Sequence, residues 1–240
     1  MTYAATDAAV VSLLHELTRV QRHHTERAEN AELARALAYL GAWQTRRLRR
    51  TYADLEAVPR YASAMRFFET DLYGGGDFAQ RDDDLVRIVP AMRRLLPANV
   101  LQTVATAVEL NALSQDLDRA VVDALWPLGE RLSVADYCAA YRRASKYEDR
   151  ERQIRLIGDV GVALDRYVGK PMLRGALKMM RKPAQLAGLS TLQDFLERGF
   201  DAFAQMGGAV EFLATIEGRE TAIHAAIAGG ASAPFPDPMA

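Results

Sequence analysis

The segment with the most side chains that could bind a ligand or react is a glycine turn. Acidic, tyrosine and arginine side chains flank this turn. Asp71 and Tyr73 precede the run 74–76 of three glycines, and Asp77 and Arg81 follow it. Three glycines favour a tight reversal because they are costly within a helix. Side chains on the two sides of such a reversal can form one rim. The pattern therefore predicts that Asp71, Tyr73, Asp77 and Arg81 surround a ligand or a partner side chain.

A purely structural role is the alternative for the same segment, residues 67–87. Asp77 can cap the helix that follows, and the acidic residues 82–84 suit the positive N-terminal end of a helix. Tyr73 and Phe78 can pack across the turn. The two alternatives differ in the effect of Asp71→Asn, which is silent if the segment is structural and abolishes binding if Asp71 holds a ligand.

A further acidic candidate, Glu109, lies in an unusually apolar stretch. Over residues 99–126 the polar positions fall in one narrow helical stripe, at about 100° per residue, and nearly all other positions are apolar. The stripe consists of Gln102, Thr106, Glu109, Asp116 and Asp123. A helix this apolar is expected at the centre of a bundle. The stripe either faces solvent or places Glu109 in an internal cleft, where burial would raise the pKa of its carboxyl group and allow acid–base chemistry.

Histidine and cysteine positions do not indicate a familiar catalytic or metal site. The sequence has one cysteine and no Glu-x-x-His motif of the kind that holds a di-iron centre. His23 and His24 have polar neighbours and are predicted to be solvated, whereas His15 is predicted to lie in the core. His224 follows Glu220 by one turn and is predicted to make a hydrogen bond on its helix. No phosphate-binding Gly-Lys-Ser/Thr loop is present, and the sequence predicts no metal or cofactor.

A basic stripe recurs at every fourth residue near a predicted helix over 171–181. It consists of Lys170, Arg174, Lys178 and Lys182, with methionine and leucine residues between them. The stripe either pairs with acidic helices of the same chain or docks onto an anionic membrane or an acidic protein. A homodimer would present two such stripes. Nucleic acid is disfavoured as a partner, because the formal net charge of the chain is −1 and no reading motif is present.

Helical periodicity extends over nearly the whole chain, with almost no alternating strand pattern. Prolines and glycines divide the chain into about nine helices, so the predicted fold is a single all-α bundle of residues 1–228. Residues 229–240 are rich in glycine and proline and predict a flexible tail. We expect Pro90 to kink or split a helix over 78–96 and Pro183 to end the basic helix. Ser133 and Ser190 are expected to cap helices.

The composition limits the class of protein. The chain has 240 residues, of which 50% are hydrophobic and 25% are charged, enough for one large domain with a substantial core. A single cysteine excludes an intramolecular disulfide and suits a reducing compartment. No leader pattern and no apolar run of membrane-spanning length is present. These features predict a cytoplasmic protein.

Several short runs resemble an uncharacterised family of bacterial all-helical proteins. They are Phe-Phe-x-x-Asp-Leu-Tyr-Gly at 67–74, Asp-Phe-x-x-Arg-Asp at 77–82, Leu-Leu-Pro at 95–97, Arg-Gln-Ile at 152–154 and Phe-Leu-Glu-Arg-Gly-Phe at 195–200. The resemblance covers most of residues 40–227. It implies a cytosolic, all-helical single domain. No activity is known for the family, so it supplies no catalytic residues. Gly75-Gly76 departs from the Gly-Pro that the family has at this turn.

Two function classes remain open, and the sequence does not decide whether the protein is an enzyme. The favoured prediction is a non-enzymatic helical binding or protein-interaction module with an anionic partner. The alternative is an enzyme, or a cofactor or ligand carrier, that uses a carboxylate- and tyrosine-lined cavity in the bundle. An enclosed cavity that touches Glu109 or Asp71 would favour the alternative, whereas a filled core would favour the first.

Overall fold

The computed structural model describes residues 2–72, 79–127 and 131–239 of the chain, and these residues are helical apart from short connections and the C-terminal tail. Within these ranges, no helix combines the length and the apolar character needed to cross a membrane. The elements of the first half are α1 (Thr2–Glu29), α2 (Ala31–Thr51), α3 (Ala53–Glu56), α4 (Pro59–Phe67), the π-helical turn η1 (Phe68–Leu72), α5 (Ala79–Leu95) and α6 (Ala98–Leu125).

The second half begins after α6 and contains several long helices and one of six residues. Its elements are α7 (Val134–Ala144), α8 (Tyr147–Val168), α9 (Pro171–Met179), α10 (Arg181–Leu186), α11 (Ser190–Met206) and α12 (Val210–Ala228). The predicted all-α fold is therefore confirmed for the part of the chain that the structure describes.

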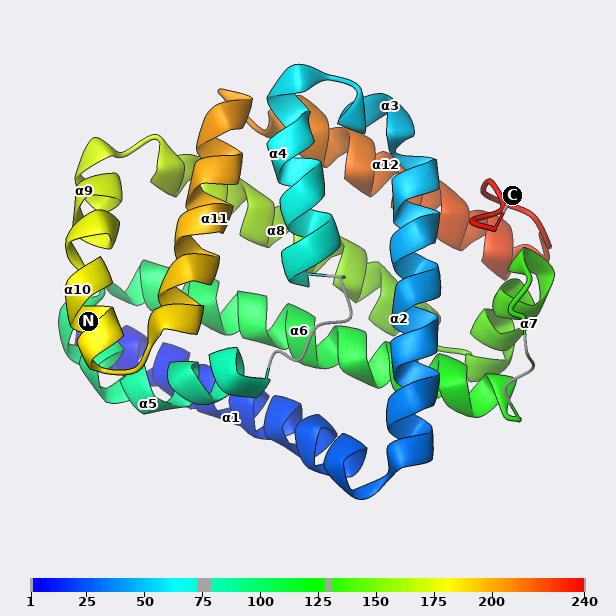
Figure 1. The fold of residues 1–240 in the computed structure, drawn as a ribbon, viewed down its shortest axis with the longest axis horizontal. Coiled ribbons are helices and arrows are strands. Elements are labelled where there is room, and N and C mark those ends of the chain that lie inside the picture. Colours follow the sequence, from blue (N-terminus) through cyan, green and yellow to red (C-terminus); the bar gives the residue numbers. More distant parts are fainter. Residues whose placement is uncertain (1, 73–78, 128–130, 240) are drawn as a thin grey trace.

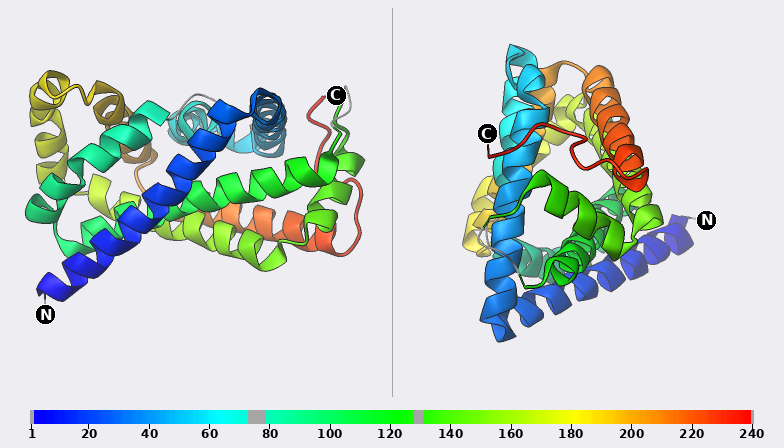
Figure 2. Two further views of the ribbon diagram at one scale, coloured as in Figure 1. Left: turned by 90° about the horizontal axis from the view of Figure 1, so that it is seen from below. Right: turned by 90° about the vertical axis from the view of Figure 1, so that its right-hand side faces the viewer.

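The helices form two layers that cross each other. In Figure 1, α2, α4 and α11 run across α6, α8 and α12, and α1 and α5 lie along the lower side. Figure 2 shows the same two layers edge-on, with α9 and α10 at one end of the molecule and α7 at the other. Side chains of both layers line an interior space.

The apolar helix α6 lies at the centre of the molecule, as its sequence predicts. It packs most extensively against α1 and also contacts α2, α7 and α8. Its buried side chains are shared between partners on different sides. Leu101, Ala105 and Val108 pack in one cluster with α1 and α5, and Val121 and Val122 in another with α2 and α7.

Local signals set several helix ends, and some expectations about them are wrong. The Ser133 side chain caps α7 by accepting the amide of Asp136 at 3.1 Å, as expected. Ser190, however, is the first residue of α11 and makes no capping bond. Helix α5 continues through Pro90, which is exposed, so water can take the hydrogen bond that the proline cannot make. Pro183 does not end a helix, because it lies in the first turn of α10, where proline is tolerated.

The C-terminal residues close the end of the bundle near α7. Residues 229–239 contain no helix, in agreement with the expected tail, but Phe235 is buried. Its ring lies edge-on to Trp43 at 6.1 Å, and Trp43 also stacks on Tyr137 at 4.7 Å. Trp43 is fully buried, and its indole donates a hydrogen bond to the Leu132 carbonyl at 2.9 Å. The tail is therefore attached to the bundle by the Phe235 ring and by a hydrogen bond from Arg142 to the Ala231 carbonyl at 3.0 Å.

Candidate functional site

A large cavity lies between the two helical layers. Its volume is about 1,710 Å³, above the roughly 300–1,000 Å³ that is usual for small-ligand pockets. Apolar side chains supply most of its walls: Val104 and Ala107 from α6, Ile154, Ile157, Val160 and Leu164 from α8, and Phe195, Leu196 and Phe203 from α11. The walls therefore suit a ligand that is largely apolar.

One face of α6 follows the cavity for most of the length of the helix. The lining runs from Val100 to Asp118, which at 1.5 Å per residue corresponds to about 27 Å. The first part of this face is mainly apolar, and the second part carries Asn111, Ser114, Gln115 and Asp118. The cavity is thus elongated and changes from apolar to polar along its length.

The polar end of the cavity is defined here as Gln44 and Arg47 of α2, Asp118 of α6, Tyr141 of α7, Arg150 of α8 and Glu220 of α12, all of which line it. Arg47 donates to both oxygens of Glu220, at 2.5 and 3.0 Å, and the Tyr52 hydroxyl donates to Glu220 at 2.6 Å. Gln44 donates to Asp118 at 2.9 Å. Helices from both layers and α7 are therefore joined through polar contacts at one end of an apolar space.

Arg150 has a different environment from Arg47. It is 8% exposed, and its guanidinium lies over the Tyr141 ring at 5.0 Å. It donates to the Gln153 side chain at 3.0 Å and to the Leu117 carbonyl at 3.4 Å. These acceptors are neutral, and no carboxylate of the described residues forms an ion pair with Arg150. Arg150 is therefore a buried cation with no carboxylate in direct contact, although its charge acts on Asp118 and Glu220.

The two carboxylates at the polar end differ in protonation behaviour. Burial acts to raise the pKa of Glu220, but the charge of Arg47 and the hydrogen bonds from Arg47 and Tyr52 together bring it below its usual range. Burial raises the pKa of Asp118, and neither the charge of Arg150 nor the bond from Gln44 offsets this effect. Glu220 is therefore held as the carboxylate, whereas Asp118 retains its proton to higher pH than an ordinary aspartate.

Asp116 and Asp118 lie two residues apart on α6, and we expect their asparagine variants to change stability in opposite directions. Because the pKa of Asp118 is raised in the folded state, its contribution to stability is lost as pH rises through that pKa, so Asp118→Asn should raise the free energy of unfolding at pH 8. Burial also acts to raise the pKa of Asp116, but its hydrogen bonds with Arg19 and His23 outweigh that effect and lower it. Asp116→Asn should therefore cost about 1 kcal/mol at pH 8 after solvent screening.

Urea unfolding of both variants at pH 8 and pH 3 measures this difference. Both effects should shrink at pH 3, where Asp118 is protonated in both states and the unfolded chain, unlike the folded protein, begins to protonate Asp116. A loss of stability at pH 8 in both variants would contradict the assignment of Asp118 as an unfavourably buried carboxylate.

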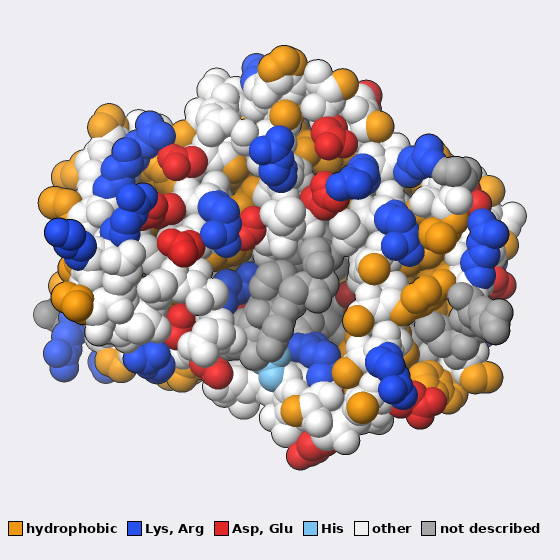
Figure 3. All heavy atoms as spheres, in the orientation of Figure 1, with side chains coloured by type: hydrophobic (Ala, Val, Ile, Leu, Met, Phe, Trp, Pro, Cys, Tyr) orange, Lys and Arg blue, Asp and Glu red, His pale blue; other side chains and the backbone are white. Residues whose placement is uncertain are grey.

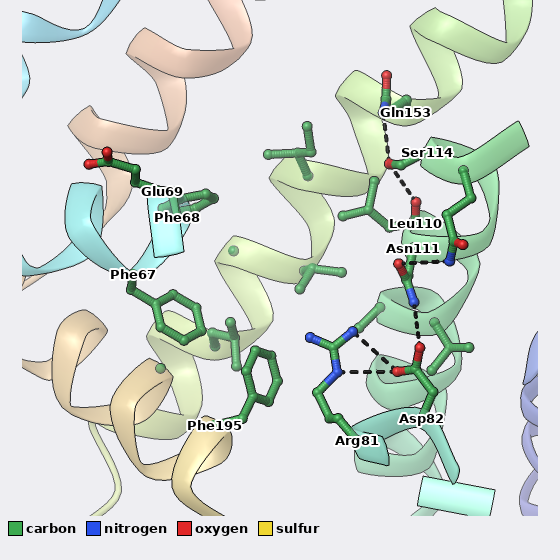
Figure 4. Close-up of a pocket in the computed structure, with 18 of the residues that line it drawn as sticks. Phe67, Phe68, Glu69, Arg81, Asp82, Leu110, Asn111, Ser114, Gln153 and Phe195 are labelled. Carbon is green, nitrogen blue, oxygen red and sulfur yellow. Dashed lines mark hydrogen bonds and ion pairs between the residues drawn. The ribbon is translucent and has the colours of Figure 1, made fainter. Parts of the chain in front are cut away.

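A second cluster of polar side chains lines the middle of the cavity, where α1, α5 and α6 meet. Arg27 donates to Nδ1 of His24 at 2.7 Å, so Nε2 of that ring carries the proton and donates to Asp82 at 3.0 Å. Asp82 also accepts from Asn111 at 3.5 Å and from Arg81 at 3.1 Å. Figure 4 shows Asp82 between Arg81 and Asn111, with Ser114 and Gln153 further along the wall. Each of these side chains has a partner within the protein.

The structure separates the residues that the sequence groups around the glycine turn. Arg81 lines the cavity, and its guanidinium lies over the Phe195 ring at 4.7 Å. Asp71 lies instead in a smaller pocket of about 360 Å³ between α4 and α11, where Arg198 donates to its carboxylate at 2.9 Å. The two residues meet only through the Asp71 carbonyl, which accepts from Arg81 at 3.4 Å. Tyr73 and Asp77 lie outside the described residues.

Glu109 does not line the cavity. Its carboxylate accepts from Arg152 of α8 at 2.6 Å, on another side of α6. The residues that do line the polar half of α6 were missed, although the sequence carried a signal for them. Asn111, Ser114, Gln115 and Asp118 have the spacing of one helical face, and this second polar stripe lies on the opposite side of the helix from the one to which Glu109 belongs.

The histidine predictions are mostly wrong. His23 is 5% exposed, and its Nε2 lies 2.7 Å from the Asp116 carboxylate, while His24 is half-buried against Asp82. His15 is exposed rather than in the core. His224 is hydrogen-bonded as predicted, but its partner is the Tyr141 hydroxyl at 2.7 Å. The packing of α1 against α6 explains these differences, since it buries the polar side of α1 that local sequence assigns to solvent.

The basic residues Lys170, Arg174, Lys178 and Lys182 are all exposed, on or beside α9 and α10. Arg174 forms an ion pair with Asp201 of α11 at 2.8 Å, and Lys170 lies over the Tyr167 ring at 6.0 Å. Because α9 ends at Met179, Lys182 belongs to the next helix. Figure 3 shows lysine and arginine side chains gathered over this end of the molecule, beside hydrophobic ones.

The comparison with protein families gives one match, to a domain of unknown function (DUF8198) over residues 23–234. The chain belongs to this family. The DUF8198 match contains the polar end of the cavity and most of the apolar wall, whereas most of α1 precedes it. No curated protein and no solved structure matches the chain. Among the described residues of this DUF8198 protein, no group of three or more histidine, cysteine, aspartate or glutamate side chains could hold a metal ion.

Proposed function

We propose that the protein binds a small molecule with an extended apolar part inside the cavity between its helical layers. The cavity itself, with a volume of about 1,710 Å³ and mainly apolar walls, is the observation that carries this proposal. A natural core is packed with few voids larger than a water molecule, so a space of this size does not serve packing. Carboxylates and tyrosines at its polar end, including Asp118, Glu220 and Tyr141, support a ligand carrier over a filled binding module.

Two measurements on the purified protein test the proposal. Organic extraction followed by mass spectrometry identifies apolar molecules that co-purify, and native mass spectrometry reports their number and whether the chain forms a homodimer. Nile red, a neutral dye whose fluorescence rises in apolar surroundings, then reports direct binding. Saturable binding of about one dye per chain supports the proposal, and the absence of both a co-purified molecule and dye binding overturns it.

Two alanines on α6 provide a matched test of where the ligand lies. Ala107 lines the cavity, whereas Ala105 is 1% exposed in the core between α1 and α5. Ala107→Phe should leave the free energy of unfolding nearly unchanged and weaken Nile red binding at least about fivefold, or about 1 kcal/mol, because the ring occupies ligand space. Ala105→Phe should lower the free energy of unfolding by about 1–3 kcal/mol, because the ring overpacks the core. Equal destabilisation by the two variants would show that Ala107 has no free space before it.

A second proposed function is docking of α9 and α10 onto an anionic membrane. Exposed apolar residues accompany the basic ones there: Met172 is 81% exposed, Met179 75% and Leu186 91%. Basic and apolar side chains on one surface are typical of helices that lie in a membrane interface. Met172 and Leu173 also line the cavity, so such contact would bring the membrane close to one end of the cavity.

Charge reversal at Lys178 and Lys182 tests this docking, since neither forms a salt bridge with another described residue, unlike Arg174. Two basic residues near an anionic surface contribute about 2 kcal/mol, so Lys178→Glu with Lys182→Glu should weaken binding to phosphatidylserine vesicles roughly thirtyfold. Arg35→Glu with Arg50→Glu, at exposed positions of α2, serves as the control. Equal binding to phosphatidylcholine vesicles, or equal loss in the control, would contradict the assignment.

A further inference from the structure

Two guanidinium groups, those of Arg47 and Arg150, line the polar end of the cavity together with the carboxyl groups of Asp118 and Glu220. Glu220 is committed to Arg47 and Tyr52, so that pair is neutral as a whole. The Nε of Arg47 is nevertheless buried without a hydrogen-bond partner. Arg150 donates to the neutral acceptors of Gln153 and Leu117 and lies over the ring of Tyr141. Its charge also acts on the carboxyl groups of Asp118 and Glu220, but no carboxylate of the described residues forms a salt bridge with it. A group entering this end therefore meets a guanidinium without a direct ion-pair partner.

A buried guanidinium without a direct ion-pair partner is costly, and an anionic ligand group in contact with it would offset that cost. Guanidinium groups bind carboxylates through strong, charge-assisted hydrogen bonds. Asp118 and Glu220 also line this end, so a group with two negative charges would meet repulsion from the Glu220 carboxylate. The surroundings favour a group with a single negative charge.

The position of Arg150 relative to the apolar walls defines the rest of the ligand. Arg150 lies near the start of α8, and the same helix continues along the cavity through Ile154, Ile157 and Leu164. The lining face of α6 runs beside them for about 27 Å. A molecule whose charged group lies at Arg150 would thus have its remaining length against hydrocarbon side chains. The cavity is shaped for an acid with one charged end and a long chain.

We propose that the ligand is a long-chain carboxylic acid whose carboxylate pairs with Arg150 and whose chain lies between α6, α8 and α11. This inference rests on the proposed ligand-binding function and specifies the class of ligand. It assigns the polar end as the site that recognises the head group and the apolar walls as the site that accepts the chain.

Two ligands with the same chain and different heads test the head-group site. Palmitic acid and palmityl alcohol each compete with Nile red for the natural protein. An ion pair with a buried guanidinium should make the acid bind at least about tenfold more tightly than the alcohol. Equal binding of acid and alcohol would overturn the assignment of Arg150 while leaving the ligand-binding function intact. Displacement by neither, with no dye binding, would overturn the ligand-binding function itself.

The variant Gln153→Glu gives Arg150 an internal counter-ion without removing it. The new carboxylate can accept from Arg150 and from the Ser114 hydroxyl, which now contacts the Gln153 amide at 2.7 Å. We expect this variant to melt at a higher temperature, to lose the preference for the acid and to keep its affinity for the alcohol. Gln205→Glu, an exposed position on α11 outside the cavity, controls for added charge and should keep the preference. Retention of the full preference in Gln153→Glu would overturn the proposal.

Discussion

Glu220→Ala should lower the free energy of unfolding by about 3–5 kcal/mol, because it leaves the buried Arg47 guanidinium without its counter-ion. Both side chains are nearly enclosed, with 11% and 15% exposure for Arg47 and Glu220, so water cannot fully replace the lost carboxylate. The Tyr52 hydroxyl would lose its acceptor at the same time. Urea unfolding of the natural and variant proteins at pH 7 measures the loss.

The double variant Arg47→Met with Glu220→Leu is the control for this effect. Replacing both members of a buried ion pair by apolar side chains of similar size is often nearly neutral, so the double variant should recover most of the lost stability. The effect should also depend on pH. The pKa of Glu220 is lowered in the folded state, so its contribution is lost as pH falls through that pKa. A loss below about 1 kcal/mol in Glu220→Ala would instead mean that water in the cavity solvates Arg47.

The second large effect is expected for Trp43→Ala, which should lower the free energy of unfolding by about 3–5 kcal/mol. The ring is fully buried between Tyr137 and Phe235, and the change also leaves the Leu132 carbonyl without its donor. Trp126 offers a matched comparison, since it is the other tryptophan of the sequence and is 48% exposed. Trp126→Ala should lower the free energy of unfolding, measured with denaturant, by less than half as much. Similar losses would show that the C-terminal tail does not hold Trp43 in a closed core.

The apolar character of α6 was sufficient to predict both its helical state and its central place. Apolar residues recur along it at spacings of three and four over a long stretch, and only a position at the centre of the bundle could cover so much apolar surface. The cavity could not be predicted in the same way. Ile154, Ile157 and Leu164 would look the same in sequence if a neighbouring helix filled the space before them. Whether it does depends on how far apart α6, α8 and α11 lie, which is a property of the whole bundle.

The surroundings of some polar residues can likewise be predicted from local sequence, whereas those of others depend on how the helices pack. The exposure of the basic residues on α9 and α10 follows from local pattern, because lysine spaced along a short helix seldom packs inside. His23 and Asp116, by contrast, lie on helices far apart in sequence, and His23 becomes buried against Asp116 only because α1 packs against α6. The polar end of the cavity has the same origin. Gln44, Asp118, Arg150 and Glu220 come from four helices, so no local spacing in the sequence shows that they lie together.

The contact between Phe235 and Trp43 has a consequence for how the chain folds while it is being synthesised. Trp43 leaves the ribosome early, and one side of its ring stays uncovered until Phe235 has been translated. At about 5–20 residues per second, this interval lasts roughly 10–40 s. During that time the nascent chain presents an aromatic surface that a chaperone can bind. The end of the bundle around α2 and α7 therefore acquires its final packing only after Phe235 has been made.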